Sequence, residues 1–83
     1  MKKWYGFDDC VIGVASIWRD QQTIEVLLYS GEKMIELLMK RDIMDDEEAQ
    51  EFLDFNVIGA YIGIETPVIV FEDPDWDERE YED

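Results

Sequence analysis

The acidic residues between positions 45 and 54 are the densest group of side chains that could act on a partner. The segment DDEEAQEFLD carries six carboxylates, and as a helix it would be roughly 15 Å long. Duplex DNA presents about one phosphate charge per 1.7 Å of its axis, so this helix would come within a factor of about two of that charge density. We therefore predict a contact surface for a basic protein.

The charge of the whole chain supports the same prediction. Its 83 residues include 22 Asp and Glu, 7 Lys and Arg and no His, which gives a net charge of −15. Nucleic acid and anionic membranes repel such a chain, whereas a basic groove attracts it. We expect a basic, nucleic-acid-binding host protein as the partner, and no direct contact with nucleic acid or membrane. The alternative is that the charge serves only solubility.

The last twelve residues, EDPDWDEREYED, repeat this acidic character with eight acids and one arginine. We predict one domain over residues 1–71 and an acidic tail over 72–83. Aromatic side chains dominate many binding surfaces, so two of them join the acids as candidate contacts. The predicted partner-binding residues are Asp46, Glu47, Glu51, Asp54, Asp73, Asp75, Trp76, Asp77, Glu78 and Tyr81.

Catalytic and metal chemistry are not predicted. The chain has no His, and its one thiol, Cys10, lies in an apolar segment without a cation beside it to lower its pKa. Consecutive acids at a helix start point in different directions, and the acidic run lacks the glycine of a calcium loop. We predict no catalytic residue, no cofactor and no metal site. A single cysteine also indicates a reducing compartment, the cytoplasm.

A second candidate site lies near two glycines, at positions 59 and 63. Asn56, Tyr61 and Thr66 could line a small-ligand pocket there, for a nucleotide signal or a similar molecule, because glycines let a ligand approach the backbone. The alternative for Asn56 is that its amide satisfies carbonyl groups at a helix end or in turns within residues 59–67.

Two strands are predicted before these sites. Residues 11–17 are β-branched at four of seven positions, and residues 23–29 alternate in hydrophobicity, which is typical of strands. The polar residues 19–22 between them have the length of a hairpin loop. We predict an antiparallel hairpin, although periodicity alone leaves a helix over 11–17 as an alternative.

Two helices and a third strand follow. Ser30 suits an N-cap, with a helix over about 31–41, and Asp45 with Glu48 suits a capping box that starts a second helix. Pro67 cannot continue a helix, so 67–71 is predicted to be a strand. The expected fold is α+β in the order β–β–α–α–β, with both helices on one face of the sheet. The inward stripe of the second helix is predicted to be Ala49, Phe52, Leu53, Asn56 and Val57, ending at Gly59.

The stretch from the second helix to the third strand resembles a family of short acidic proteins encoded by phages and prophages. The shared residues are Glu47, Glu48 and Ala49, then Phe55, Asn56, Gly59, Ala60, Tyr61, Gly63, Thr66 and Pro67. The resemblance implies a phage accessory protein, located in the host cytoplasm. The leading hypothesis is an inhibitor of a host defence or transcription complex; a nucleotide-signal binder and a structural or assembly protein that forms homo-oligomers are the alternatives.

Overall fold

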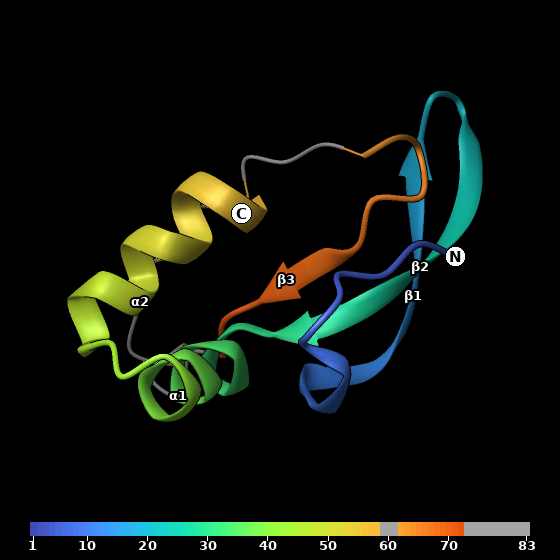
Figure 1. Ribbon diagram of the computed structural model, residues 1–83. Helices are drawn as coiled ribbons and strands as arrows, with labels where there is room; N and C mark the ends of the chain where they lie inside the picture. The colour runs from blue at the N-terminus through green and yellow to red at the C-terminus, as the bar shows by residue number, and fades with distance from the viewer. Residues whose placement is uncertain (59–61, 73–83) are drawn as a thin grey trace, which may run out of the picture.

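The order of elements is the predicted β–β–α–α–β of a small α+β domain (Figure 1). The computed structural model describes residues 1–58 and 62–72. A 3₁₀ turn precedes the first strand, and a π-helical turn continues the second helix. The elements are the 3₁₀ turn Asp8–Cys10, β1 Val11–Arg19, β2 Gln22–Ser30, α1 Gly31–Arg41, α2 Asp46–Leu53, the π-helical turn Asp54–Ile58 and β3 Val68–Val70.

The first two strands form the predicted antiparallel hairpin, which confirms a strand rather than a helix over 11–17. The connection is shorter than the four residues expected, because the ladder continues to the pair Arg19–Gln22. Only Asp20 and Gln21 lie between the strands, with φ of 50° and 62°. Two consecutive residues with positive φ are typical of a type I′ turn, whose twist matches that of a hairpin.

The third strand makes the sheet mixed. β3 pairs with β2 in parallel, in the register Leu28–Val68, Tyr29–Ile69 and Ser30–Val70. The strand order is β1-β2-β3, so β2 is central and the other two are edges. A parallel neighbour requires a long crossover, and both helices lie in the crossover that returns the chain to β2.

The helices pack on the face of the sheet that carries Tyr29, as predicted (Figure 1). Tyr29, Met34 and Leu38 have no exposed surface, and Leu53 is only 1 % exposed. The Tyr29 hydroxyl oxygen accepts a hydrogen bond of 3.0 Å from the backbone N–H of Trp4. The ring centroids of these two residues lie 5.1 Å apart. The N-terminal segment therefore closes one side of the core.

Both predicted helix starts are confirmed by side-chain caps. The Ser30 hydroxyl accepts a hydrogen bond from the backbone N–H of Lys33 at 3.3 Å. Asp45 and Glu48 form a reciprocal capping box, with bonds of 2.8 Å and 3.3 Å. These bonds satisfy N–H groups that have no partner within the helix.

The predicted inward stripe of the second helix is wrong at Asn56. Ala49, Leu53 and Val57 are buried, but Asn56 is exposed, and its Nδ2 donates to the carbonyl oxygen of Phe52 at 3.2 Å. The reason is the π-helical turn Asp54–Ile58, since a turn closed by i→i+5 bonds does not keep the 3.6-residue period. The alternative role for Asn56, bonding to a helix carbonyl, describes it correctly.

Several predictions fall on residues outside the described ranges. Gly59 as the end of the second helix, the residues 60 and 61, and nearly all of the predicted tail belong to this group. Within the described ranges, no helix has the length and apolar character needed to cross a membrane.

Candidate functional site

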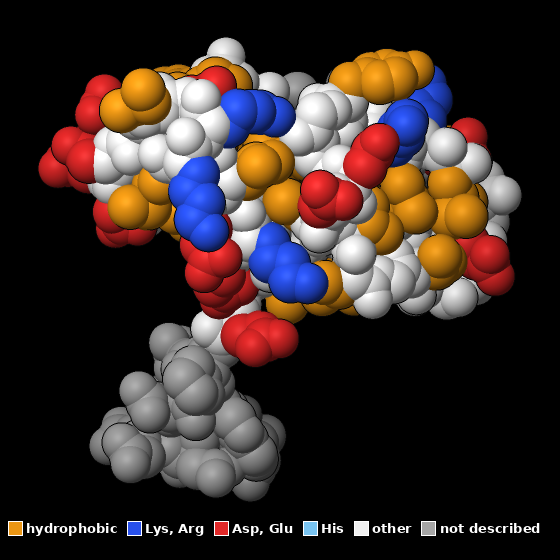
Figure 2. Space-filling view, turned by 60° about the horizontal axis from the view of Figure 1, so that its bottom comes forward, with side chains coloured by type: hydrophobic (Ala, Val, Ile, Leu, Met, Phe, Trp, Pro, Cys, Tyr) orange, Lys and Arg blue, Asp and Glu red, His pale blue; other side chains and the backbone are white. Residues whose placement is uncertain are grey.

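The outer face of α2 presents the predicted acidic surface. Asp46, Glu47, Glu51 and Asp54 are all exposed. The last three are spaced i, i+4 and i+7, which places them on one side of a helix. Figure 2 shows acidic side chains gathered at the left end of the molecule, over α2. The opposite side of α2 is anchored in the core by the buried residues Ala49 and Leu53. The backbone that carries the carboxylates is therefore fixed by packing.

These carboxylates have no basic partner among the residues that the structure describes. The ion pairs there join the N-terminal amine to Glu65 at 3.5 Å, Lys3 to Asp8 at 3.5 Å, and Arg41 to Asp42 at 3.3 Å. Among the carboxylates of α2, only Asp46 accepts a hydrogen bond from another described side chain, the neutral amide of Gln50 at 2.9 Å. The negative charge of Glu47, Glu51 and Asp54 is therefore available to a cationic surface.

An exposed aromatic residue, Phe55, adjoins this acidic face and was not among the predicted contact residues. Its side chain is 82 % exposed, and Ile58 in the same turn is 50 % exposed. Phe55 follows Asp54 directly in the π-helical turn that continues α2, which places it at the end of the acidic helix. An apolar residue next to the acidic run was the signal in the sequence that could have identified it.

The remaining predicted contact residues belong to the tail. Asp73, Asp75, Trp76, Asp77, Glu78 and Tyr81 lie outside the described residues. Their role in binding stays a prediction, and the candidate surface is defined here by Glu47, Glu51, Asp54 and Phe55. We call these four residues the acidic face.

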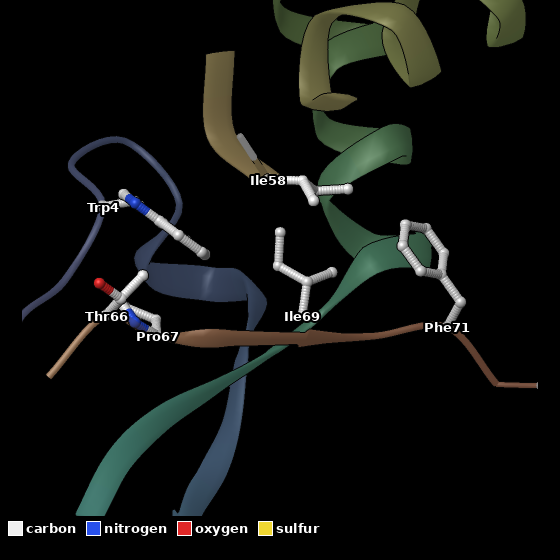
Figure 3. Close-up of a pocket in the computed structure, with 6 residues that line it drawn as sticks. All are labelled: Trp4, Ile58, Thr66, Pro67, Ile69 and Phe71. Carbon is white, nitrogen blue, oxygen red and sulfur yellow. The ribbon is translucent and has the colours of Figure 1, made fainter. Parts of the chain in front are cut away.

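Of the three residues predicted to line a ligand pocket, the described structure places one at a cavity. A cavity of about 240 Å³ is lined by Trp4, Ile58, Thr66, Pro67, Ile69 and Phe71, with Ile58 and Ile69 facing each other (Figure 3). Thr66 belongs to this wall, whereas Asn56 is exposed elsewhere and Tyr61 lies outside the described residues. The Thr66 hydroxyl accepts from the backbone N–H of Ile62 at 2.9 Å and donates to the carbonyl oxygen of Gly63.

The chemistry of this cavity is mainly apolar. Its described lining contains no Lys or Arg, so a phosphate group would meet no cation there. The Nε1 of Trp4 has no hydrogen-bond partner among the described residues, but the atom is itself buried and therefore does not open into the cavity. The lining suits a small apolar molecule best.

Cys10 has the properties of a structural thiol. It is 2 % exposed, and burial raises its pKa above the usual value, with the nearby carboxylate of Asp9 acting in the same direction. A raised pKa lowers the thiolate fraction and hence the nucleophilicity. Across residues 1–58 and 62–72, no group of three or more His, Cys, Asp or Glu side chains is arranged to hold a metal ion.

Comparisons with protein-family models, with curated proteins and with solved structures found no match to this chain. The resemblance of residues 7–71 to small acidic phage proteins, with its shared residues between positions 47 and 67, therefore stays a prediction. The physical properties of the surface carry the functional argument.

Proposed function

We propose that this chain is a non-catalytic protein that binds a basic protein where nucleic acid would bind, and thereby inhibits it. A phage-type accessory protein acting on a defence or transcription complex in the host cytoplasm is the setting we infer. The observation that carries the proposal is the acidic face: three exposed carboxylates without a basic partner among the described residues, on a capped helix, beside the exposed Phe55.

The two kinds of side chain would contribute differently. Carboxylates attract a basic surface over long range, raise the association rate and make binding sensitive to salt. Aromatic side chains that become fully desolvated contribute a large share of the binding free energy. In this proposal Glu47, Glu51 and Asp54 take the places of phosphates, and Phe55 fills an adjacent apolar depression on the target.

Matched charge variants test this proposal. The full chain is immobilised and used to capture proteins from host lysate, beside a variant with Glu47→Gln, Glu51→Gln and Asp54→Asn. The control carries Asp20→Asn, Glu25→Gln and Glu36→Gln, which remove the same charge from exposed positions outside the acidic face. We expect the control to retain the captured protein and the acidic-face variant to lose it.

The captured protein is then purified for a competition experiment. Duplex DNA should displace the chain from it, and affinity should fall steeply as salt rises. Capture that is equal for both triple variants, or binding that DNA does not compete, would contradict the proposal. Phe55→Ala should weaken binding at every salt concentration, because its contact does not depend on charge.

The cavity beside Trp4 supports a second candidate function, binding of a small molecule. The supporting observation is the mainly apolar lining, which has no Lys or Arg among the described residues and therefore suits an apolar ligand better than a nucleotide. Thermal shift with cyclohexanone and with ATP separates the two ligand types. A stabilisation by cyclohexanone that Trp4→Phe removes would support this function, and no shift with either probe would count against it.

A further inference from the structure

The outer edge of β1 is open from Val14 to Trp18 in the described structure. β1 pairs with β2 on one side only. Because the turn has two residues, Arg19 and Gln22 form a hydrogen-bonded pair, and such pairs recur at every second position. The backbone groups of Val14, Ser16 and Trp18 therefore point away from β2, and no turn or loop of the described residues bonds to them.

The side chains on this strand leave the edge unprotected. Ile12, Val14 and Trp18 are 44 %, 52 % and 71 % exposed. Natural edge strands are usually blocked by charges, by proline or by irregular pairing. β1 has one irregularity, between Val11 and Gly13, and its sequence VIGVASIWR contains no proline, no acid and one base at its end. Hydrophobic side chains gather on the hairpin side of the molecule, at the right of Figure 2.

We propose that β1 pairs antiparallel with β1 of a second copy of this chain, joining two three-stranded sheets into one of six strands. The regular ladder beyond the irregularity runs from Gly13 to Arg19, and its midpoint is Ser16. A two-fold axis at Ser16 pairs this whole segment with the same segment of the second copy. Ser16 then lies opposite Ser16 of the other copy, and Trp18 lies opposite Val14.

The distribution of charge makes this edge the place where a second copy meets the least repulsion. The chain carries a net charge of −15, so two copies can approach most easily where carboxylates are absent, and β1 contains none. In the proposed register Arg19 lies opposite Gly13, where the space beyond the Cα is open to 4 Å. The acidic face lies on α2, away from this edge, and stays exposed. The inference is therefore independent of the proposed function.

The oligomeric state of the full chain tests the proposal. Sedimentation is measured over about a hundredfold range of protein concentration, at 0.1 M and 1 M salt, where the Debye length is about 10 Å and about 3 Å. We expect a monomer–dimer equilibrium that shifts at least tenfold toward dimer at the higher salt, since screening weakens the repulsion between the copies. A monomer under all these conditions would overturn the proposal.

A pair of substitutions at Ser16 identifies the edge. Ser16→Pro removes the outward N–H without removing a bond to β2, so the dimer should be lost, while Ser16→Ala should retain it. Far-ultraviolet circular dichroism and thermal unfolding check that both variants fold. A dimer that survives in folded Ser16→Pro, or one that Phe55→Ala abolishes instead, would show a different interface and overturn the inference.

Cross-linking tests the register without depending on how proline affects the fold. In a Cys10→Ala background, Ser16→Cys should form a disulfide-linked dimer under mild oxidation, because Cα atoms in a hydrogen-bonded antiparallel pair are about 5.5 Å apart, within the range of disulfides. The control is Thr23→Cys, exposed on β2. Equal cross-linking of both variants would contradict the register. Binding of another protein's strand to a monomeric chain would overturn the proposal.

Discussion

The acidic face on α2 and the outer edge of β1 are both exposed surfaces with an aromatic residue, and they differ in charge. The acidic face has three carboxylates beside Phe55, whereas β1 has Trp18 and no carboxylate. Salt should therefore act on them in opposite directions: it weakens attraction of the acidic face to a basic protein and reduces repulsion between two copies at the edge. One chain can thus have two contact surfaces with different requirements.

The two regions also differ in how they are held. α2 is fixed by buried side chains and by a capping box. The far half of β1, residues 15–19, is held by its ladder to β2 and by hydrogen bonds from Arg19 to the carbonyl oxygens of Ile64 and Thr66. The side chains of Ser16 and Trp18 are exposed. Changes beneath α2 should therefore reduce the stability of the fold, while changes on the exposed side of β1 should affect association alone.

The largest effect is expected for Leu53→Ala, which would test whether α2 depends on the core. Leu53 is 1 % exposed, and removing such a side chain typically costs about 2–5 kcal/mol of unfolding free energy. Phe55→Ala, two residues later and 82 % exposed, is the control and should change stability by less than about 0.5 kcal/mol. Urea unfolding measures both. Equal losses of unfolding free energy in the two variants would contradict the assignment of Leu53 to the core and Phe55 to the surface.

The second prediction concerns the capping box. Asp45→Ala removes the acceptor of the Glu48 N–H bond and should cost about 1 kcal/mol. Asp45→Asn keeps an acceptor and loses the charge, so it should retain most of the stability. Equal unfolding midpoints in urea for the alanine variant and wild type would show that α2 does not need its cap.

The third prediction concerns strain in the connection before α2. Ile43 has a φ of 53° and is 89 % exposed. A β-branched residue is disfavoured in this left-handed region, so Ile43→Gly should stabilise the fold by about 0.5–1 kcal/mol. Ile43→Val keeps the strain and should leave stability unchanged. Thermal unfolding distinguishes them, and a less stable glycine variant would contradict the prediction.

The fourth prediction concerns Trp18→Thr, which tests whether the exposed aromatic residue of β1 affects association without affecting the acidic face. Trp18 is 71 % exposed, and threonine also suits a strand, so the stability of the monomer should change by less than about 0.5 kcal/mol. The dimer proposed above should weaken at least tenfold in sedimentation. Binding of the acidic face to its target should stay unchanged, and a loss there would link the two surfaces.

The smallest effect is expected for Cys10, which is buried in the core directly before β1. Its pKa is raised in the folded state, so its contribution to stability is fully present below the unfolded pKa and is lost as pH rises from about 9 through the folded pKa. The stability of wild type relative to Cys10→Ala should therefore fall above about pH 9. Urea unfolding at pH 7 and pH 10 checks this, and a constant difference would contradict it.

Local signals in the sequence were sufficient for the helices. Ser30 and Asp45 both cap the helices that they were expected to start, because a cap depends on a few neighbouring residues. The hairpin was also predicted, since alternation and β-branching are local patterns. The type I′ turn was missed because Asp20–Gln21 lacks the glycine that normally indicates it.

Features that depend on distant residues could not be predicted. The parallel pairing of β3 with β2 depends on the direction in which the chain re-enters the sheet after α1 and α2. No pattern of neighbouring residues encodes that direction. Asn56 faces outward because of a π-helical turn, which breaks the period used to place it. The cavity combines Trp4 with residues from 58 to 71, so only the assembled fold reveals it.

The parallel pairing of β2 with β3 has a consequence for the order of folding. The hairpin pairs residues such as Arg19 and Gln22 that are close in the chain, but Leu28 meets Val68 only after the intervening 39 residues have been arranged. Closing a long loop costs entropy before its contacts are gained. We therefore expect β3 to join the sheet last, and amide hydrogens bonded between β2 and β3 to exchange before those of the hairpin.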